Sequence, residues 1–132
     1  MAEKTIADKL LIKPGSTLWI SDEARLGLLG PLPPGVAPTS DPTRASTSIV
    51  IADDAASARR RFATDGTALL GSANLWVLYP KGNKADINRD SLWPILAEFG
   101  FRPISQVSID DTWSALRFRA LREGEAPFKG GR

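Results

Sequence analysis

The sequence predicts an open α/β fold whose sheet is mainly parallel and ends in an antiparallel β-hairpin. Two largely apolar runs, residues 48–52 and 75–79, are each followed by polar residues and then by a helical pattern. Such continuous runs are typical of strands covered on both faces, as in a parallel sheet. Residues 102–109 and 113–121 show alternation instead, and the short link between them predicts a hairpin.

The first half of the chain predicts four elements, each bounded by a capping or turn residue. Thr5 and Asp22 are the expected N-caps, because their side-chain oxygens can accept from free amides of the first helical turn. Pro38 confines the second strand to a sheet edge, since proline has no amide to donate to a neighbour. In chain order we expect a helix over residues 5–12, a strand over 17–21, a helix over 23–29 and a strand within 36–39.

Two longer helices are expected in the second half. The first follows Asp53 and Asp54, which supply its N-cap, and runs from residue 55 to about residue 64. Pro94 decides where the second begins, because a proline costs little in the first turn but about 3 kcal/mol in a helix interior. With Asp90 as the N-cap, Pro94 is the fourth helical residue. The expected buried stripe is Leu92, Ile95, Leu96 and Phe99, and Gly100 ends the helix.

Composition indicates one domain and excludes several chemistries. The 132 residues are 42% hydrophobic and 24% charged, as in a globular single domain. The chain has no cysteine and no histidine, which rules out a disulfide, a thiolate nucleophile and a serine–histidine–aspartate triad. No apolar run approaches the ~20 residues that span a bilayer, and the first residues lack a signal-peptide core. We therefore expect a cytoplasmic location.

Positive charge gathers near the C-terminus. The whole chain carries 17 Lys and Arg against 15 Asp and Glu, a net charge of +2. Residues 117–132 contain five basic and two acidic side chains, so this segment alone carries +3. We expect residues 1–132 to form a single domain and residues 122–132 to be a flexible basic tail.

Four segments resemble a family of small uncharacterised bacterial proteins: residues 11–15 (LIKPG), 29–33 (LGPLP), 76–81 (WVLYPK) and 110–118 (DDTWSALRF). The strand pattern is similar to a shortened class I methyltransferase fold, which is Rossmann-like with helices on both faces of the sheet. The resemblance implies that the last strand lies between the strands at 75–79 and 102–109. It also implies that Trp113 begins beside Pro80 and Lys81. It implies no particular activity.

The chain departs from methyltransferases where their cofactor binds. Those enzymes place a glycine-rich turn after the first strand, so that the backbone approaches the cofactor closely. Here that turn, residues 21–25, reads Ser-Asp-Glu-Ala-Arg and has no glycine. The acidic residue expected after the second strand has Asp41 as its candidate. We therefore predict no cofactor, and S-adenosylmethionine binding is disfavoured.

Ligands of open α/β sheets bind outside the carboxyl ends of the strands. These ends are followed here by residues 21–22, 53–54 and 80–89, and by the hairpin tip, residues 110–112, if the first hairpin strand is parallel to the others. Two lysines and a flexible backbone around Gly82 suit an anion. The candidate ligand-binding residues are Lys81, Asn83, Lys84, Arg89, Asp110, Thr112 and Trp113; no catalytic or metal-binding residue is predicted.

Structural interpretations compete with these sites. Residues 81–84 are also typical of a solvated turn, and residues 86–90 offer either oxygen ligands for a hard cation or turn and capping groups. The aspartates of the hairpin tip can serve as an acid–base pair, bond their own backbone, or form an ion pair with Lys81 or Arg89. We favour that ion pair, as a structural tie.

Two further residue sets have structural interpretations. Trp19 and Trp76 lie within apolar strands and are expected in the core. The consecutive Arg59, Arg60 and Arg61 are expected to point in different directions from a helix, so that they form a solvated face and no single patch.

The lead hypothesis is a non-catalytic domain that binds a protein partner or a small anionic ligand at the carboxyl edge of the sheet. One alternative is a divergent S-adenosylmethionine-dependent methyltransferase-like enzyme. A second alternative is weak nucleic-acid binding through the basic C-terminal strand and tail. A homodimer is compatible with the sequence, and no membrane partner is expected.

Overall fold

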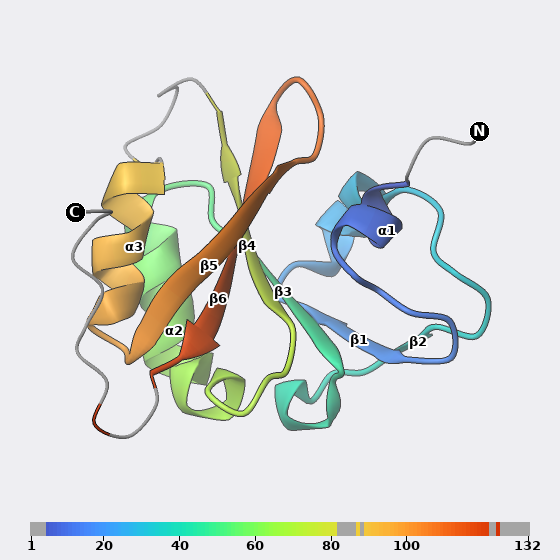
Figure 1. The fold of residues 1–132 in the computed structure, drawn as a ribbon, viewed down its shortest axis with the longest axis horizontal. Coiled ribbons are helices and arrows are strands. Elements are labelled where there is room, and N and C mark those ends of the chain that lie inside the picture. Colours follow the sequence, from blue (N-terminus) through green and yellow to red (C-terminus); the bar gives the residue numbers. More distant parts are fainter. Residues whose placement is uncertain (1–4, 82–86, 88, 122–123, 125–132) are drawn as a thin grey trace.

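The fold is a six-stranded sheet with helices on both faces (Figure 1). The computed structural model describes residues 5–81, 87, 89–121 and 124. Within these ranges no helix is long and apolar enough to cross a membrane. In chain order the elements, with η for 3₁₀ helices, are α1 (Ile6–Lys9), β1 (Thr17–Ile20), η1 (Glu23–Leu29), β2 (Ala37–Pro38), η2 (Pro42–Arg44), β3 (Thr47–Ile51), α2 (Ala55–Leu69), β4 (Leu75–Pro80), α3 (Arg89–Ala97), β5 (Phe101–Ser108) and β6 (Trp113–Ala120).

The strands lie in the order β2-β1-β3-β4-β6-β5. The first four are parallel, and β6 pairs antiparallel with both β4 and β5. This arrangement confirms the predicted Rossmann-like sheet with a C-terminal hairpin. Because β6 inserts between β4 and β5, Trp113 pairs with Pro80, as the resemblance implied. β5 therefore runs parallel to β4, and the hairpin tip lies at the carboxyl edge of the sheet, at the top of Figure 1.

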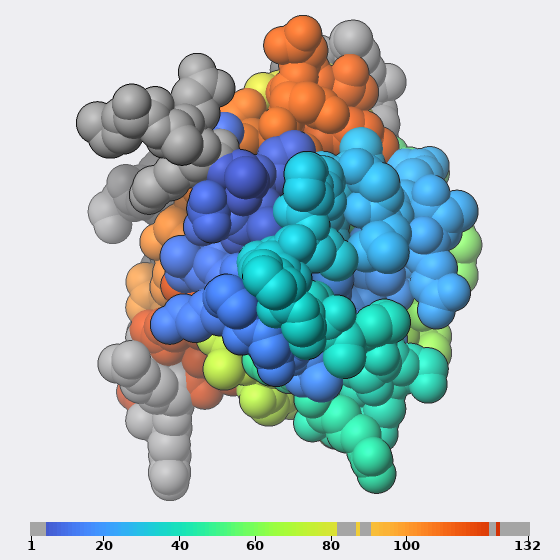
Figure 2. All heavy atoms as spheres, turned by 90° about the vertical axis from the view of Figure 1, so that its right-hand side faces the viewer, coloured from blue at the N-terminus to red at the C-terminus, as the bar shows by residue number. Residues whose placement is uncertain are grey.

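Two apolar cores, one on each face of the sheet, hold the three layers together. α2 and α3 pack on one face, where Phe62 and Leu116 are buried. α1 and η1 pack on the other face, over Leu18. Figure 2 views the molecule from this side, where the N-terminal part of the chain forms the surface. Trp19 and Trp76 are 6% and 1% exposed and belong to opposite cores, so both tryptophans are core residues as predicted.

α1 begins where it was predicted but ends early. Thr5 caps it by accepting from the amide of Asp8 at 3.1 Å. Leu11 then takes a positive φ of 60°, and its amide donates to the carbonyl of Asp8, while the amide of Ile12 donates to that of Ala7. This pair of bonds is typical of a helix C-terminus. α1 therefore stops at residue 9, whereas residue 12 was expected.

α2 is longer than the sequence predicted. It continues to residue 69, past the end expected near residue 64. Gly66 lies inside the helix and is buried beside Phe62 and against Phe99, which follows α3. A glycine in a helix interior is tolerated where packing compensates for its lost entropy.

α3 corrects the predicted N-cap. It begins at Arg89, so Asp90 lies inside the helix and Pro94 is an interior residue. A proline there removes one hydrogen bond. The helix still buries Leu92 and Leu96 completely, and burial of two such side chains outweighs one missing bond. α3 ends at Ala97, earlier than expected, and Gly100, the predicted stop, follows three residues later in the turn that leads to β5, with a φ of 89°.

Proline lies in both outer strands of the sheet. Pro38 belongs to β2, which confirms its edge position. β5 forms the other edge and contains Pro103, and its register against β6 shifts between Pro103 and Ser105. The shift leaves Ile104 without a cross-strand partner in β6, and this large apolar residue is 44% exposed. A bulge of this kind interrupts the side-chain alternation locally.

Candidate functional site

The direction in which strands are added reverses between β1 and β3. From β1 the chain adds β2 on one side, then returns past β1 to add β3 and β4 on the other. In open α/β sheets, ligands bind in the crevice outside the carboxyl ends of the strands at such a reversal. A cleft of about 410 Å³ occupies this position. It is lined by Ser21, Asp22, Ile51, Asp53, Ser57, Arg60, Arg61 and Thr64.

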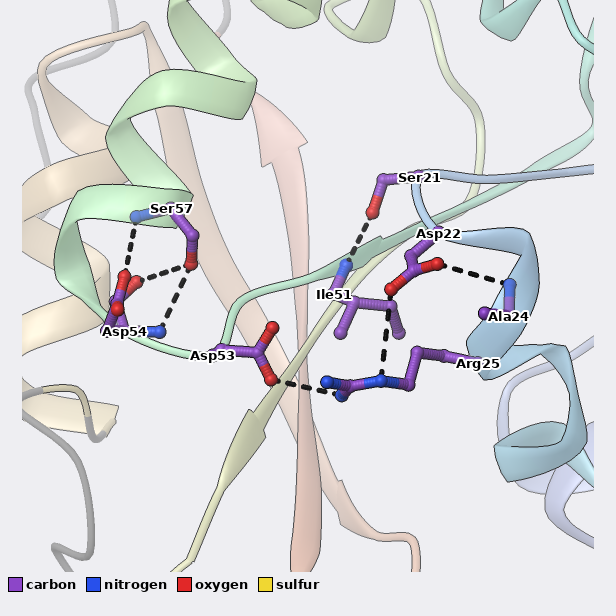
Figure 3. Close-up of polar contacts among 8 residues, drawn as sticks. All are labelled: Ser21, Asp22, Ala24, Arg25, Ile51, Asp53, Asp54 and Ser57. Atoms are coloured by element: carbon purple, nitrogen blue, oxygen red, sulfur yellow. Dashed lines mark hydrogen bonds and ion pairs between the residues drawn. The ribbon is translucent and has the colours of Figure 1, made fainter.

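Ser21 joins the ends of β1 and β3 beneath the cleft (Figure 3). Its amide donates to the carbonyl of Ile49 at 2.9 Å, and its Oγ accepts from the amide of Ile51 at 2.8 Å. The Ser21 hydroxyl thus satisfies the amide of Ile51, because β1 has already ended at Ile20 and offers this amide no carbonyl. This contact fixes the backbone of both strand ends relative to each other.

Arg25 bridges two carboxylates at the rim of the cleft (Figure 3). Asp22 caps η1 as predicted, since its Oδ1 accepts from the amide of Ala24 at 3.1 Å. Its Oδ2 lies 3.8 Å from Nε of Arg25, whose Nη1 lies 3.0 Å from Oδ1 of Asp53. All three side chains are partly exposed, so each pair contributes at most about 1 kcal/mol. The role of the two ion pairs is to fix the place of η1, because they hold it against the end of β3.

The wall opposite η1 is the start of α2. Asp54 is its N-cap, as predicted: Oδ1 accepts from the amide of Ser57 at 2.7 Å, and the amide of Asp54 donates to the Ser57 hydroxyl at 3.1 Å (Figure 3). Hydrogen bonds from the amide and then the hydroxyl of Ser57 hold the pKa of Asp54 below its ordinary value. Ser57 therefore both anchors the helix and lines the cleft.

The three consecutive arginines of α2 divide between two surfaces. Arg59 turns to the α3 side, where its Nη1 lies 2.7 Å from Oε2 of Glu98. Arg61 pairs with Asp65 at 2.9 Å and donates to the carbonyl of Ser21 at 3.3 Å. Arg60 is exposed and forms no ion pair with any residue that the structure describes. The three arginines therefore form no single patch, as expected, although Arg60 and Arg61 line the same cleft.

The hairpin tip and the end of β4 lie together, as the sequence predicted. The amide of Lys81 donates to the carbonyl of Thr112 at 2.8 Å, next to the Pro80–Trp113 pair. The Lys81 ammonium donates to Oγ of Ser108 at 2.5 Å. Lys81, Thr112 and Trp113 are therefore neighbours at the carboxyl edge.

Asp110 stabilises the hairpin turn by itself. Its Oδ1 accepts from the amides of Thr112 at 2.8 Å and Trp113 at 2.7 Å. Among the ion pairs that join described residues, none involves Asp110 or Asp111. The tie between hairpin and Lys81 is thus a backbone hydrogen bond and a contact with a serine, where an ion pair was expected.

Several predicted residues fall outside the described part of the chain. Asn83 and Lys84 are among them, and so are Asp86 and Asn88 of the alternative cation site. Arg89 begins α3, but its side chain is not described. Within the described ranges, no group of three acidic side chains is arranged to hold a metal ion. The proposed basic tail, residues 122–132, is described at Gly124 alone.

Arg25 connects the cleft with the hairpin. Its guanidinium carbon lies 5.3 Å from the centre of the Trp113 ring, within the range of a cation–π contact. The same guanidinium reaches Asp53 at the cleft. Arg25 therefore joins the cleft to the hairpin tip at the carboxyl edge. The sequence did not indicate this role for Arg25.

The sequence placed Ser21, Asp22 and Asp53 at strand ends, whereas Arg60 and Arg61 of the cleft were interpreted as part of a solvated face. The signal that could have found Arg60 and Arg61 is their place in the first two turns of the helix that follows β3. The position of these arginines predicts a site only once the strand order is known, because the cleft beside this helix lies where the strand order reverses, between β1 and β3.

The fold is similar to solved Rossmann-like proteins. A protein of the NADB-Rossmann superfamily from Streptococcus agalactiae matches with a TM-score of 0.57 and 13% identity, covering 98% of this chain and 72% of its own. A proposed tRNA (m1A22) methyltransferase from Streptococcus pneumoniae, solved with S-adenosyl-L-methionine, matches with a TM-score of 0.50 and 14% identity, covering 98% and 76%. No family model and no curated protein matches the sequence. The likeness establishes a methyltransferase-like fold, and the resemblance to uncharacterised bacterial proteins stays a prediction.

Proposed function

We propose that this Rossmann-like domain binds a small anionic ligand at the carboxyl edge of its sheet and does not itself catalyse a reaction. The observation that carries the proposal is the cleft at the strand reversal, with Arg60 on its wall. Within the described chain the two carboxylates at the rim are already engaged by Arg25, and Arg61 by Asp65. Arg60 is left as the cation available to an incoming anion.

The chemistry of this wall favours a phosphate or carboxylate group. A guanidinium presents several N–H donors in a plane and matches the oxygens of such groups. Arg61 lines the same cleft, but its guanidinium is already held by Asp65 and by the carbonyl of Ser21. Ser57 and Thr64 also line this wall, but their hydroxyls already donate to the carbonyls of Asp54 and Arg60, so the guanidinium of Arg60 is the donor offered to an anion.

The other end of the ligand would extend towards the hairpin. Arg25 spans this distance, since it contacts both Asp53 and Trp113. We therefore keep the predicted residues Lys81, Asn83, Lys84, Arg89, Asp110, Thr112 and Trp113 as candidates for contacts outside the cleft. Among them, Asp110 is the weakest candidate, because its carboxylate already accepts from two amides.

Binding without catalysis is supported by the residue types available. The chain has no histidine and no cysteine, which are the side chains best suited to proton transfer and nucleophilic attack near neutral pH. The carboxylates of Asp22 and Asp53 at the cleft are already engaged by the guanidinium of Arg25.

Calorimetric titration with inorganic phosphate, AMP and ATP tests the proposal. Arg60→Gln should weaken the binding of the tightest of these probes about tenfold or more, because one charge-assisted hydrogen bond is lost. Arg59→Gln is the matched control: it removes the same charge from the same helix, but on the side of Glu98. We expect it to leave the affinity unchanged.

The outcomes separate the parts of the proposal. Binding that falls in Lys81→Gln but not in Arg60→Gln would move the anion to the hairpin side and contradict the role given to the cleft. Equal losses in Arg59→Gln and Arg60→Gln would indicate a general charge effect. No binding of any probe at concentrations up to about 10 mM would reject a ligand of this class.

A divergent S-adenosylmethionine-dependent enzyme is the second candidate. The fold likeness to a methyltransferase solved with that cofactor favours it. The segment from Ser21 to Arg25 opposes it, because these five residues include no glycine and lead directly into η1, and Arg25 lies across the strand ends. A ligand that binds only the folded state must raise the melting temperature, so an unchanged melting temperature with millimolar S-adenosylmethionine would exclude this candidate.

A further inference from the structure

A second cleft lies at the opposite, amino edge of the sheet, where β1, β3 and β4 begin. Its volume is about 320 Å³. It is lined by the segment after α1, the residues at the starts of β3 and β4, and one side chain of β6, among them Leu11, Lys13, Thr47, Ala73, Asn74 and Arg117. This cleft shares no lining residue with the cleft at the carboxyl edge.

The polar floor of this second cleft is rigid and internally satisfied. Asn74, 7% exposed, donates to the carbonyl of Leu10 at 2.8 Å and to Oγ1 of Thr47 at 3.0 Å. Its Oδ1 accepts from Nε1 of Trp76 at 2.9 Å. These groups therefore shape the cleft, while recognition of a charged ligand falls to the side chains around them.

Two cations and no acidic side chain line the cleft. Lys13 is exposed at its mouth. Arg117 donates through Nη2 to the carbonyl of Ala73 at 3.3 Å, whereas its Nε is buried without a hydrogen-bond partner among described groups. A buried donor left without an acceptor is unfavourable. An anion beside Arg117 would face its guanidinium charge and would meet no opposing carboxylate.

Leu11 supplies an apolar rim at a conformational cost. It occupies the left-handed position after α1 that usually carries glycine, with a φ of 60°. An L-residue with a Cβ is disfavoured there. Its side chain is nevertheless 48% exposed on the wall of the cleft, so the core gains little from it. Residues held in such conformations cluster at binding sites.

We propose that the amino-edge cleft binds a small amphipathic anion. The apolar body of the ligand would lie against Leu11 and Ala73, and its carboxylate or phosphate would lie between Lys13 and Arg117. The shared chemistry is a compact apolar group that carries one anionic head. The site is independent of the function proposed for the carboxyl edge.

Chemical-shift titration of the ¹⁵N-labelled chain tests this with benzoate, phenyl phosphate and inorganic phosphate. The indole N–H of Trp76 and the side-chain amide of Asn74 lie at the floor and are the reporter signals. We expect both organic anions to shift them in a saturable manner. Inorganic phosphate, which has no apolar body, should bind at least about tenfold more weakly. The stronger of the two organic probes identifies the preferred head group.

Matched variants make the test decisive. Lys13→Gln should weaken the organic probes about tenfold, and Leu11→Asn, which tolerates the left-handed conformation, should weaken them as well. Lys9→Gln removes an equal charge from α1 outside the cleft, and Arg60→Gln perturbs only the carboxyl edge; both should leave the affinity unchanged. Reporter signals that do not move, or equal losses in Lys13→Gln and Lys9→Gln, would overturn the proposal.

Discussion

Replacing Asn74 with alanine should destabilise the fold far more than its size indicates. Asn74 makes three buried hydrogen bonds, which join the end of α1 to the starts of β3 and β4. At about 1 kcal/mol for each bond, Asn74→Ala should lower the free energy of unfolding by about 3 kcal/mol. The indole of Trp76 keeps its second acceptor, the carbonyl of Leu10 at 2.9 Å, so no further donor is orphaned.

Urea denaturation followed by circular dichroism measures this loss. We expect the midpoint to fall with an unchanged slope, because the surface exposed on unfolding stays the same. For a domain of this size, the melting temperature should fall by roughly 10 °C or more. Ser72→Ala is the control, since it removes one hydrogen bond, to Ser48 at 3.2 Å, and should cost about 1 kcal/mol or less. A loss below about 1 kcal/mol in Asn74→Ala would refute the reasoning.

Three further substitutions test local features, each by the same denaturation assay. Gly66→Ala should stabilise by about 0.5–1 kcal/mol, because the added Cβ would lie 3.7 Å from the nearest atom inside a helix; destabilisation would contradict this. Gly100→Ala should cost about 1 kcal/mol or more, because φ is 89° there; an unchanged midpoint would contradict it. The lowered pKa of Asp54 gives stability that is present above its unfolded pKa and lost as the pH falls through the folded value. Asp54→Asn should therefore flatten the decline of stability between about pH 5 and pH 2; an unaltered profile would contradict this.

Much of the sheet could be predicted because its signals are local. Continuous apolar runs predicted β3 and β4. Pro38 predicted an edge strand, because a residue without an amide donor cannot complete the hydrogen bonds of an inner strand in any fold. N-caps at Thr5, Asp22 and Asp54 followed from side-chain chemistry within three residues. The misplaced boundaries depended on tertiary packing instead. Gly66 stays helical because of its surroundings, which no local pattern reports.

The candidate site was predicted in part for a related reason. Lys81, Thr112 and Trp113 could be placed together because a hairpin beside β4 brings its tip to the end of that strand. The cleft beside Arg60 required knowledge of which strands are neighbours, and spacing along the chain does not contain it. The reach of Arg25 to Asp53 and Trp113 likewise depends on how η1 folds back over the strand ends.

The prolines at the two margins of the sheet limit how copies of this molecule can associate. Pro38 and Pro103 each withhold an amide from a margin, and the irregularity at Ile104 bends one of them. A continuous sheet shared between two molecules needs a straight, fully hydrogen-bonded border on each side. Neither margin offers one, so any pair of molecules would have to meet through helices or loops, and growth into fibrils by strand addition is opposed at both ends.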